Sequence, residues 1–201
     1  MKRHFFNLKK PKPAIFLDRD GVLIQRHLLT WQKKQMRLAP KIVKLIKKFN
    51  EQNVSIIVIT NQPVIARGLI TEDGVNMLHK ILQNRLKKQG AKIDKFYFCP
   101  HHPEANLEKY RRNCGCRKPK IGLFKKAAKE FNLNLEKSFL IGDMTQDILA
   151  GKRAKIKTIL LTNSGHKGID GKFKIEPNYK KPTLASALTM IYNFWFNTDK
   201  E

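Results

Sequence analysis

Residues 14–21 read Ala14-Ile15-Phe16-Leu17-Asp18-Arg19-Asp20-Gly21, and this stretch is the strongest indication of fold class in the 201-residue chain. Four apolar residues run without interruption into two carboxylates and a glycine. A short continuous apolar run is typical of a strand that is buried on both faces of a sheet. Gly21 allows the backbone to turn sharply after the strand. The stretch therefore predicts a buried strand that ends at Asp18.

Similar apolar runs recur further along the chain. They cover residues 54–59, ending at Thr60; residues 93–98, leading into Cys99; residues 138–141, ending at Gly142-Asp143; and residues 158–161, ending at Thr162-Asn163. Stripes of apolar residues at helical spacing lie between them: Ile42, Leu45, Ile46 and Phe49; Val75, Leu78, Leu82 and Leu86; and Leu123, Phe124, Ala127, Ala128 and Phe131. Alternating strands and helices predict an α/β fold with a doubly wound, mainly parallel, Rossmann-like sheet.

The spacing of the predicted elements leaves little room for a second domain. No large insertion follows Gly21 or Thr60, so we expect no bulky cap domain above the sheet edge. Residues 166–181 are rich in Gly and Lys and indicate a loop with room for one edge strand, and residues 184–195 indicate a closing helix. Residues 1–201 are therefore expected to form a single domain, which is long enough to bury a sizeable core.

Hydropathy argues against a membrane protein. The chain contains no apolar run of the ~20 residues that a spanning helix needs. Its first residues, Met1-Lys2-Arg3-His4-Phe5-Phe6, are basic but lack the apolar stretch of a signal peptide. We therefore expect a cytoplasmic protein, and we expect it to be a monomer.

The charge is strongly basic, with Lys+Arg 41 against Asp+Glu 16 and a formal net charge of +25. Such a charge attracts anions, and nucleic acid is one partner that it makes possible. Lysine-rich codon usage would produce the same charge without any functional meaning. Because the lysines are scattered over nearly every segment and form no single stripe, this second interpretation is favoured.

Three of the predicted strands end in polar residues that bear on chemistry: Asp18, Thr60 and Asp143. Ligands of open parallel sheets bind beyond the carboxyl ends of the strands, so these residues are expected to meet at one edge. Asp18 and Asp20 can divide nucleophilic and acid–base roles between them. Clustered carboxylates repel one another unless a cation lies among them, and Mg²⁺ suits such a site. Asp-x-Asp-Gly alone is weak support, because Asp and Gly are common in turns.

All three cysteines fall within one short window, residues 99–116. Cys99-Pro100-His101 is followed, after 12 residues, by Cys114-Gly115-Cys116. Three thiolates and one imidazole, from His101 or the adjacent His102, make a closed tetrahedral set for structural zinc. Three unrelated buried thiols are the alternative, which the polar neighbourhood disfavours. Since Arg117 and Lys118 follow directly, zinc would order the loop that carries both cations.

Four ordered motifs resemble the haloacid dehalogenase superfamily of phosphatases over about residues 13–165. They are Phe16-Leu17-Asp18-Arg19-Asp20-Gly21-Val22, Ile59-Thr60-Asn61-Gln62, Arg117-Lys118-Pro119-Lys120 and Ile141-Gly142-Asp143-Met144-Thr145-Gln146-Asp147. The resemblance implies that Asp18 forms an aspartyl-phosphate and that Asp20 is the general acid and base. It further implies that Thr60 and Lys118 hold the phosphoryl group, and that Asp18, the Asp20 backbone and Asp143 bind Mg²⁺. Asp147 either touches the metal through water or caps the helix that begins near Thr145.

The cysteine window narrows the resemblance to the D-glycero-D-manno-heptose 1,7-bisphosphate 7-phosphatase family. Its pattern is Cys99-Pro100-His101-His102-Pro103 with Cys114-Gly115-Cys116-Arg117-Lys118-Pro119, accompanied by Thr60-Asn61-Gln62 and Ile65-Ala66-Arg67-Gly68. This family implies a small phosphorylated sugar as substrate, His101 as zinc ligand, and Asn61, Arg67 and Arg117 as substrate-binding residues.

The chain also departs from the heptose pattern. Pro63-Val64 replaces a common Ser-Gly pair, Met144 replaces a substrate-contacting lysine, and the loop from Gln25 to Gln35 follows the usual recognition stretch poorly. Three alternatives therefore stay open. They are a histidinol-phosphate phosphatase, a nucleic-acid 3′-phosphatase that uses the basic charge, and, least favoured, a scaffold without catalytic activity.

Overall fold

The computed structural model describes residues 10–25, 27, 29–164 and 173–197. Six strands form one sheet with all neighbours parallel, in the order β3-β2-β1-β4-β5-β6. The strands are β1 (Ala14–Leu17), β2 (Ser55–Asn61), β3 (Lys95–Cys99), β4 (Phe139–Gly142), β5 (Lys157–Leu161) and β6 (Tyr179–Lys181). The predicted parallel α/β fold is confirmed.

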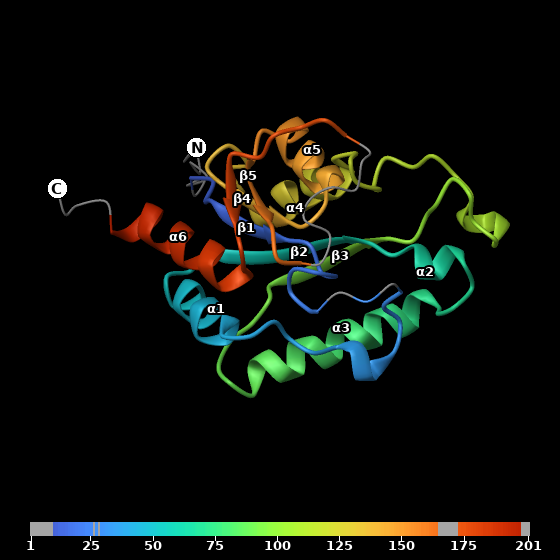
Figure 1. Cartoon of the computed structure of the whole chain (residues 1–201), viewed down its shortest axis with the longest axis horizontal. Helices are drawn as coiled ribbons and strands as arrows, with labels where there is room; N and C mark the ends of the chain where they lie inside the picture. The colour runs from blue at the N-terminus through green and yellow to red at the C-terminus, as the bar shows by residue number, and fades with distance from the viewer. Residues whose placement is uncertain (1–9, 26, 28, 165–172, 198–201) are drawn as a thin grey trace, which may run out of the picture.

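Helices cover both faces of the sheet (Figure 1). The helices α1 (Ile42–Glu51), α3 (Glu72–Lys87) and α6 (Leu184–Phe196) lie on one face, and α4 (Gly122–Phe131) and α5 (Thr145–Arg153) on the other. Alternation within β1 explains this layering, because Ile15 and Leu17 join the core under the first set while Ala14 and Phe16 join the core under the second. The apolar run of β1 is needed because each face contacts a helical layer.

Local sequence signals account for the ends of the elements. In α3, the Thr71 hydroxyl accepts a hydrogen bond from Gly74 N at 3.1 Å, while Glu72 and Asp73 occupy the positively polarised first turn. Gly21 has φ of +89°, which side-chain-bearing residues rarely adopt, and it turns the chain after β1 as expected. Two strand predictions differ from the structure by two residues: β2 continues through Thr60 to Asn61, and β3 begins at Lys95.

The described segments after β1 and β2 contain only short helices before the next large element. These are η1 (Lys33–Gln35) and α2 (Pro63–Ala66), so no cap-sized unit follows Gly21 or Thr60 in the described part of the chain. The expected loop at 166–181 is described only from residue 173 and includes β6 at its end. Residues 1–9, which include the basic start of the chain, lie outside the description. Among the described helices, none has the length and apolarity needed to cross a bilayer.

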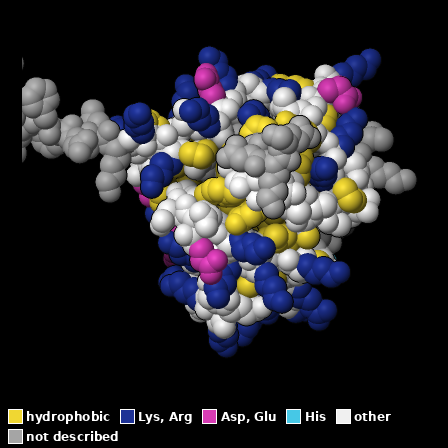
Figure 2. Space-filling model, turned by 90° about the vertical axis from the view of Figure 1, so that its left-hand side faces the viewer, with side chains coloured by type: hydrophobic (Ala, Val, Ile, Leu, Met, Phe, Trp, Pro, Cys, Tyr) yellow, Lys and Arg dark blue, Asp and Glu magenta, His cyan; other side chains and the backbone are white. Residues whose placement is uncertain are grey.

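Basic side chains are distributed widely over the face of the molecule that Figure 2 shows. Figure 2 shows Lys and Arg all around one face of the molecule, with hydrophobic side chains between them. On this face they form no single stripe. The view agrees with the interpretation that the charge of +25 is spread over the chain.

Candidate active site

A pocket of about 230 Å³ opens at the carboxyl edge of the sheet. The strand order reverses at the β1–β4 pair, which is where doubly wound sheets bind ligands. All of the predicted catalytic and substrate-binding residues line this pocket: Asp18, Asp20, Thr60, Lys118, Asn61, Arg67 and Arg117. The sequence prediction that residues far apart along the chain meet here therefore agrees with the structure.

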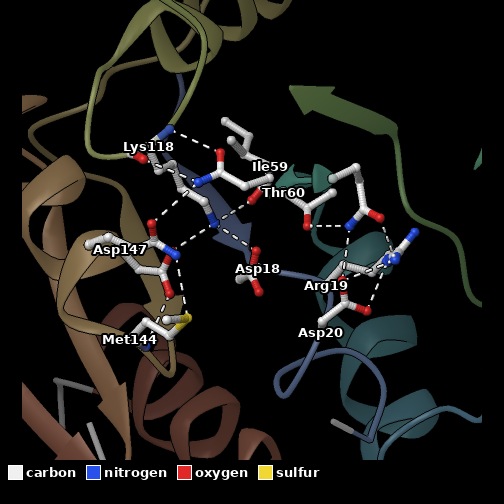
Figure 3. Close-up of polar contacts among 11 residues, drawn as sticks. Asp18, Arg19, Asp20, Ile59, Thr60, Lys118, Met144 and Asp147 are labelled. Atoms are coloured by element: carbon white, nitrogen blue, oxygen red, sulfur yellow. Dashed lines mark hydrogen bonds and ion pairs between the residues drawn. The ribbon is translucent and has the colours of Figure 1, made fainter. Parts of the chain in front are cut away.

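Lys118 lies at the centre of the site and is 2% exposed. Its Nζ contacts Asp18 Oδ1 at 2.6 Å and Asp147 Oδ1 at 2.7 Å, and it donates to the Ile59 carbonyl at 2.8 Å (Figure 3). Burial alone would lower the pKa of Lys118, but the Asp147 and Asp18 carboxylates raise it above its ordinary value. The ammonium group therefore keeps its charge at any physiological pH.

Asp18 is buried beside this cation and beside other acids. Burial is the main cause that raises the pKa of Asp18 to about 6, opposed by Lys118 and assisted by Asp147 and Asp20. A nucleophilic carboxylate must be ionised. A divalent cation next to Asp18 would favour the ionised form, since an opposite charge stabilises a carboxylate.

The carboxylates of Asp18, Asp143 and Asp147 form a group that suits such a cation, because one oxygen of each lies within 4.8 Å of the others. A set of carboxylate oxygens beside a pocket that Arg67, Arg117 and Lys118 line fits Mg²⁺. Asp147 Oδ2 also accepts a hydrogen bond from Met144 N at 3.1 Å at the start of α5. Both roles considered for Asp147, at the metal and at the helix start, are therefore compatible with its position.

The Asp20 side chain turns away from this acidic group toward Arg19 (Figure 3). Arg19 Nε donates to Asp20 Oδ1 at 3.1 Å and Arg19 Nη2 to Oδ2 at 3.0 Å. Gln62 Nε2 donates to the same Oδ2 at 2.9 Å and to Thr60 Oγ1 at 3.0 Å. The predicted metal role of Asp20, through its backbone carbonyl, leaves the side chain available for these contacts.

Arg19 is fully buried, with 0% exposure. Besides Asp20, its guanidinium contacts Gln62 Oε1 at 2.8 Å, the Thr30 carbonyl at 3.2 Å and His79 Nε2 at 3.3 Å. His79 lies on α3 and stacks on Phe96, with ring centroids 4.7 Å apart. Burial, assisted by Arg19, lowers the pKa of His79 to about 3. The imidazole is therefore neutral at physiological pH, and its Nε2 accepts a hydrogen bond from Arg19.

A second group of ligand atoms lies beside the pocket. One atom each of Cys99, His101, Cys114 and Cys116 lies within 4.8 Å of the others. Cys116 Sγ is 3.1 Å from both other sulfurs, and His101 Nδ1 is 3.3 Å from Cys116 Sγ. His102 points elsewhere, since its Nδ1 accepts from Glu104 N at 3.1 Å. The structure thus brings His101 to the three sulfurs, a donor set that fits four-coordinate zinc.

This cysteine–histidine group is connected directly to the pocket. Arg117 Nη1 donates to the His101 carbonyl at 3.1 Å, which fixes the guanidinium next to the group. Asn61 holds the following residue, because its Oδ1 accepts from Lys118 N at 3.0 Å and its Nδ2 donates to Lys118 O at 3.1 Å. Asn61, predicted to bind substrate, therefore also positions the backbone of Lys118.

A basic cleft adjoins the pocket on the side of the cysteine–histidine group. It shares Arg67, Arg117 and Lys118 with the pocket and adds three further cations, Arg112, Lys120 and Arg153. Among the described residues that line it, Glu104 is the single acidic one. The cleft is therefore suited to bind an anionic group next to one that the pocket itself would hold.

Several pocket residues had no assigned role in the sequence analysis. His27 and Gln146 line the pocket, and Gln62 contacts two predicted catalytic residues. Gln62 was visible as part of a motif, whereas His79 was hidden within the amphipathic helix of residues 75–86. A polar residue next to the apolar stripe of α3 was the available signal for His79.

Comparisons with known proteins agree with this geometry. Residues 115–187 match a family model described as "HAD-hyrolase-like". The D-glycero-beta-D-manno-heptose-1,7-bisphosphate 7-phosphatase of Pasteurella multocida is 37% identical over 180 residues, covering 90% of this chain and 97% of that protein. The enzyme of the same name from Rhodopseudomonas palustris is 40% identical, covering 72% and 81%. The structure of the D,D-heptose 1,7-bisphosphate phosphatase of B. bronchiseptica with magnesium and phosphate has a TM-score of 0.80 at 24% identity, covering 90% and 99%.

Proposed function

The chain belongs to the family of D-glycero-D-manno-heptose-1,7-bisphosphate 7-phosphatases, and from this membership we propose that it hydrolyses the 7-phosphate of such a bisphosphate through an aspartyl-phosphate on Asp18. One observation carries the proposal. Asp18, Asp20, Thr60 and Lys118, drawn from three separate motifs, line a single pocket that continues into a basic cleft.

The first step is attack by an Asp18 carboxylate oxygen on phosphorus, with the sugar alkoxide leaving on the opposite side. Asp20 protonates that alkoxide and then takes a proton from the water that hydrolyses the aspartyl-phosphate. Lys118 and the Thr60 hydroxyl hold the transferring phosphoryl oxygens, whose negative charge is spread during transfer. Lys118 suits this role because its neighbours keep it charged.

The Asp18–Asp143–Asp147 group and the Asp20 carbonyl are proposed to hold Mg²⁺, as magnesium accompanies phosphate in the B. bronchiseptica enzyme. When bound, Mg²⁺ neutralises phosphoryl charge and favours ionised Asp18. Cys99, His101, Cys114 and Cys116 are proposed to hold structural zinc. Their contribution is to fix Arg117 and Lys118 in place.

The second phosphate of the substrate is proposed to bind in the basic cleft. Arg67 and Arg117 line both the pocket and the cleft, so they lie between the two anionic groups. Met144, which stands in place of a lysine, lines the pocket without adding a charge. Holding the non-reacting phosphate helps to position the reacting one, which lowers the barrier through binding energy.

Phosphate release across a panel of phosphorylated compounds tests this function. The panel contains both anomers of the heptose 1,7-bisphosphate, the corresponding 7-monophosphate, histidinol phosphate and a 3′-phosphorylated oligonucleotide. We expect the highest kcat/KM with a bisphosphate, cleaved at the 7-position. A preference for histidinol phosphate or for the oligonucleotide would overturn the assignment.

A further inference from the structure

Two of the motifs at the pocket contain a polar residue that the mechanism above does not use: Arg19 in residues 16–22 and Gln62 in residues 59–62. Gln62 is 1% exposed and Arg19 is 0% exposed, so both are part of the buried wall of the site. Buried polar side chains cost free energy unless their hydrogen bonds are satisfied. Their contacts therefore indicate what they are placed to do.

The orientation of the Gln62 amide follows from the chemistry of its neighbours. A guanidinium can only donate, so the group 2.8 Å from Arg19 Nη2 is the amide oxygen. The amide nitrogen must then face Asp20 Oδ2, at 2.9 Å, and Thr60 Oγ1, at 3.0 Å. One glutamine thus links the proposed general acid to the proposed phosphoryl-binding hydroxyl, with its two donor protons directed one to each.

These bonds leave defined atoms for the reaction. Thr60 Oγ1 accepts from Gln62, so its own proton remains for a phosphoryl oxygen in the pocket. Asp20 Oδ2 accepts from Arg19 and Gln62, whereas Oδ1 accepts only from Arg19 among the described residues. Oδ1 is therefore the atom of Asp20 with capacity left to hold a proton.

We propose that Gln62, fixed in one amide orientation by Arg19, is a positioning residue that sets both the Thr60 hydroxyl and the Asp20 carboxylate for phosphoryl transfer. The inference rests on the proposed roles of Asp20 and Thr60. His79 supports it from behind, since its Nε2 accepts from Arg19 Nη1 at 3.3 Å and thereby keeps the guanidinium facing Gln62.

Gln62→Glu tests the proposal, because it keeps the side-chain shape but replaces the donating nitrogen with an oxygen. We expect kcat for the sugar phosphate to fall by about 10²-fold, in the range that general acid–base groups contribute. The leaving group of p-nitrophenyl phosphate needs no protonation. With this substrate we expect the rate of the initial burst of nitrophenol to fall only ~10-fold or less. A role limited to folding would lower both rates equally.

Gln83→Glu is the matched control. The Gln83 side chain also makes two hydrogen bonds, since its Nε2 donates to the Ile93 carbonyl and its Oε1 accepts from Ile93 N, both at 3.0 Å, but it lies on α3 away from the pocket. It should lose stability without changing the ratio of the two rates. If Gln62→Glu does not fold, Gln62→Met, of similar size and uncharged, carries the same comparison.

Equal losses on both substrates, or a Gln62 variant with unchanged kcat, would overturn the positioning role. A different result would overturn the assignment of the heptose substrate. If the wild type prefers another alkyl phosphate in the panel, that compound replaces the bisphosphate and the comparison of leaving groups stands.

Discussion

At the scale of single residues, Lys118 links two carboxylates of the site, those of Asp18 and Asp147. Its three protons point to Asp18, Asp147 and the Ile59 carbonyl, at 2.6, 2.7 and 2.8 Å. A phosphoryl oxygen that enters the pocket must therefore share this ammonium with a carboxylate. The arrangement keeps Asp18 and the phosphoryl group close to the same positive charge.

Asp18→Asn should abolish phosphatase activity while preserving the fold. Loss of a nucleophile costs on the order of 10⁴-fold or more in kcat. Because burial and neighbouring acids raise the pKa of Asp18 to about 6, ionised Asp18 lowers the stability of the folded protein relative to the unfolded chain at pH 7. The neutral amide should therefore not lower Tm in the absence of Mg²⁺. Activity assays and thermal scans check this, and comparable turnover in the variant would remove Asp18 from the mechanism.

His79 makes stability depend on pH in a defined direction. Its folded-state pKa is about 3, below the ordinary 6.5, so only the unfolded chain gains a proton between these values. The contribution of His79 to the free energy of unfolding is therefore complete above pH 6.5 and is lost as pH falls toward 3. Between pH 7 and pH 5 the loss is about 2 kcal/mol.

His79→Gln, which keeps an acceptor for Arg19, should remove that dependence. Urea unfolding at pH 7 and pH 5 measures it as the difference between the two proteins in their change of unfolding free energy. An equal change in both proteins would mean that His79 titrates normally when folded.

The segment between β3 and α4 shows how one element is fixed at both ends. It begins at the Cys99 end of β3 and returns to α4, where Gly122 N donates to Gly115 O at 3.0 Å. A Cβ on Gly122 would lie 2.5 Å from Gly115 O, so only glycine allows this approach. Regular structure within the segment is limited to η2 (Glu108–Tyr110). The cysteine–histidine group joins the two ends of the segment, while Ala105 and Tyr110 in its middle pack against Ile65, Ala66 and Val75.

Cys114→Ser should lose zinc, lower Tm and reduce kcat/KM, because Arg117 and Lys118 would lose their fixed positions. His101→Ala should also lose zinc, while His102→Ala should retain it, since His102 Nδ1 bonds to Glu104 N instead. Elemental analysis of the purified proteins checks the metal content. Full zinc occupancy in His101→Ala, or none in the wild type, would contradict the assignment.

At the scale of the whole molecule, the sequence predicted the arrangement of the site better than its hydrogen bonds. Asp18, Thr60 and Asp143 follow apolar runs, and parallel topology alone brings such strand ends together. β2 continued beyond its prediction because Thr60 and Asn61 still pair with Phe98 and Cys99 of β3, which polarity alone does not indicate. The Gln62 and His79 contacts were not predictable, because they depend on Arg19 reaching two other elements.

The net charge of +25 should affect encounter with the substrate rather than chemistry. Raising salt from about 50 to 200 mM should lower kcat/KM for the heptose bisphosphate less than about ten-fold, with kcat unchanged, because screening weakens only long-range attraction. A nucleic-acid substrate contacted through many phosphates would lose about 10³–10⁵-fold over the same range. Initial-rate measurements at both salt concentrations distinguish the two, and the steeper loss would give the basic surface a nucleic-acid partner.

The position of β1 in the sheet has a consequence for synthesis on the ribosome. β1 precedes the other described strands in the chain, yet it pairs with both β2 and β4, with Ile15 opposite Phe139. Its second neighbour is thus translated more than a hundred residues later, and Ala14 N waits equally long for Ser138 Oγ. During elongation the nascent chain exposes one unpaired edge of its most apolar strand. We therefore expect chaperones that bind nascent chains to matter most during this interval, before the fold is complete.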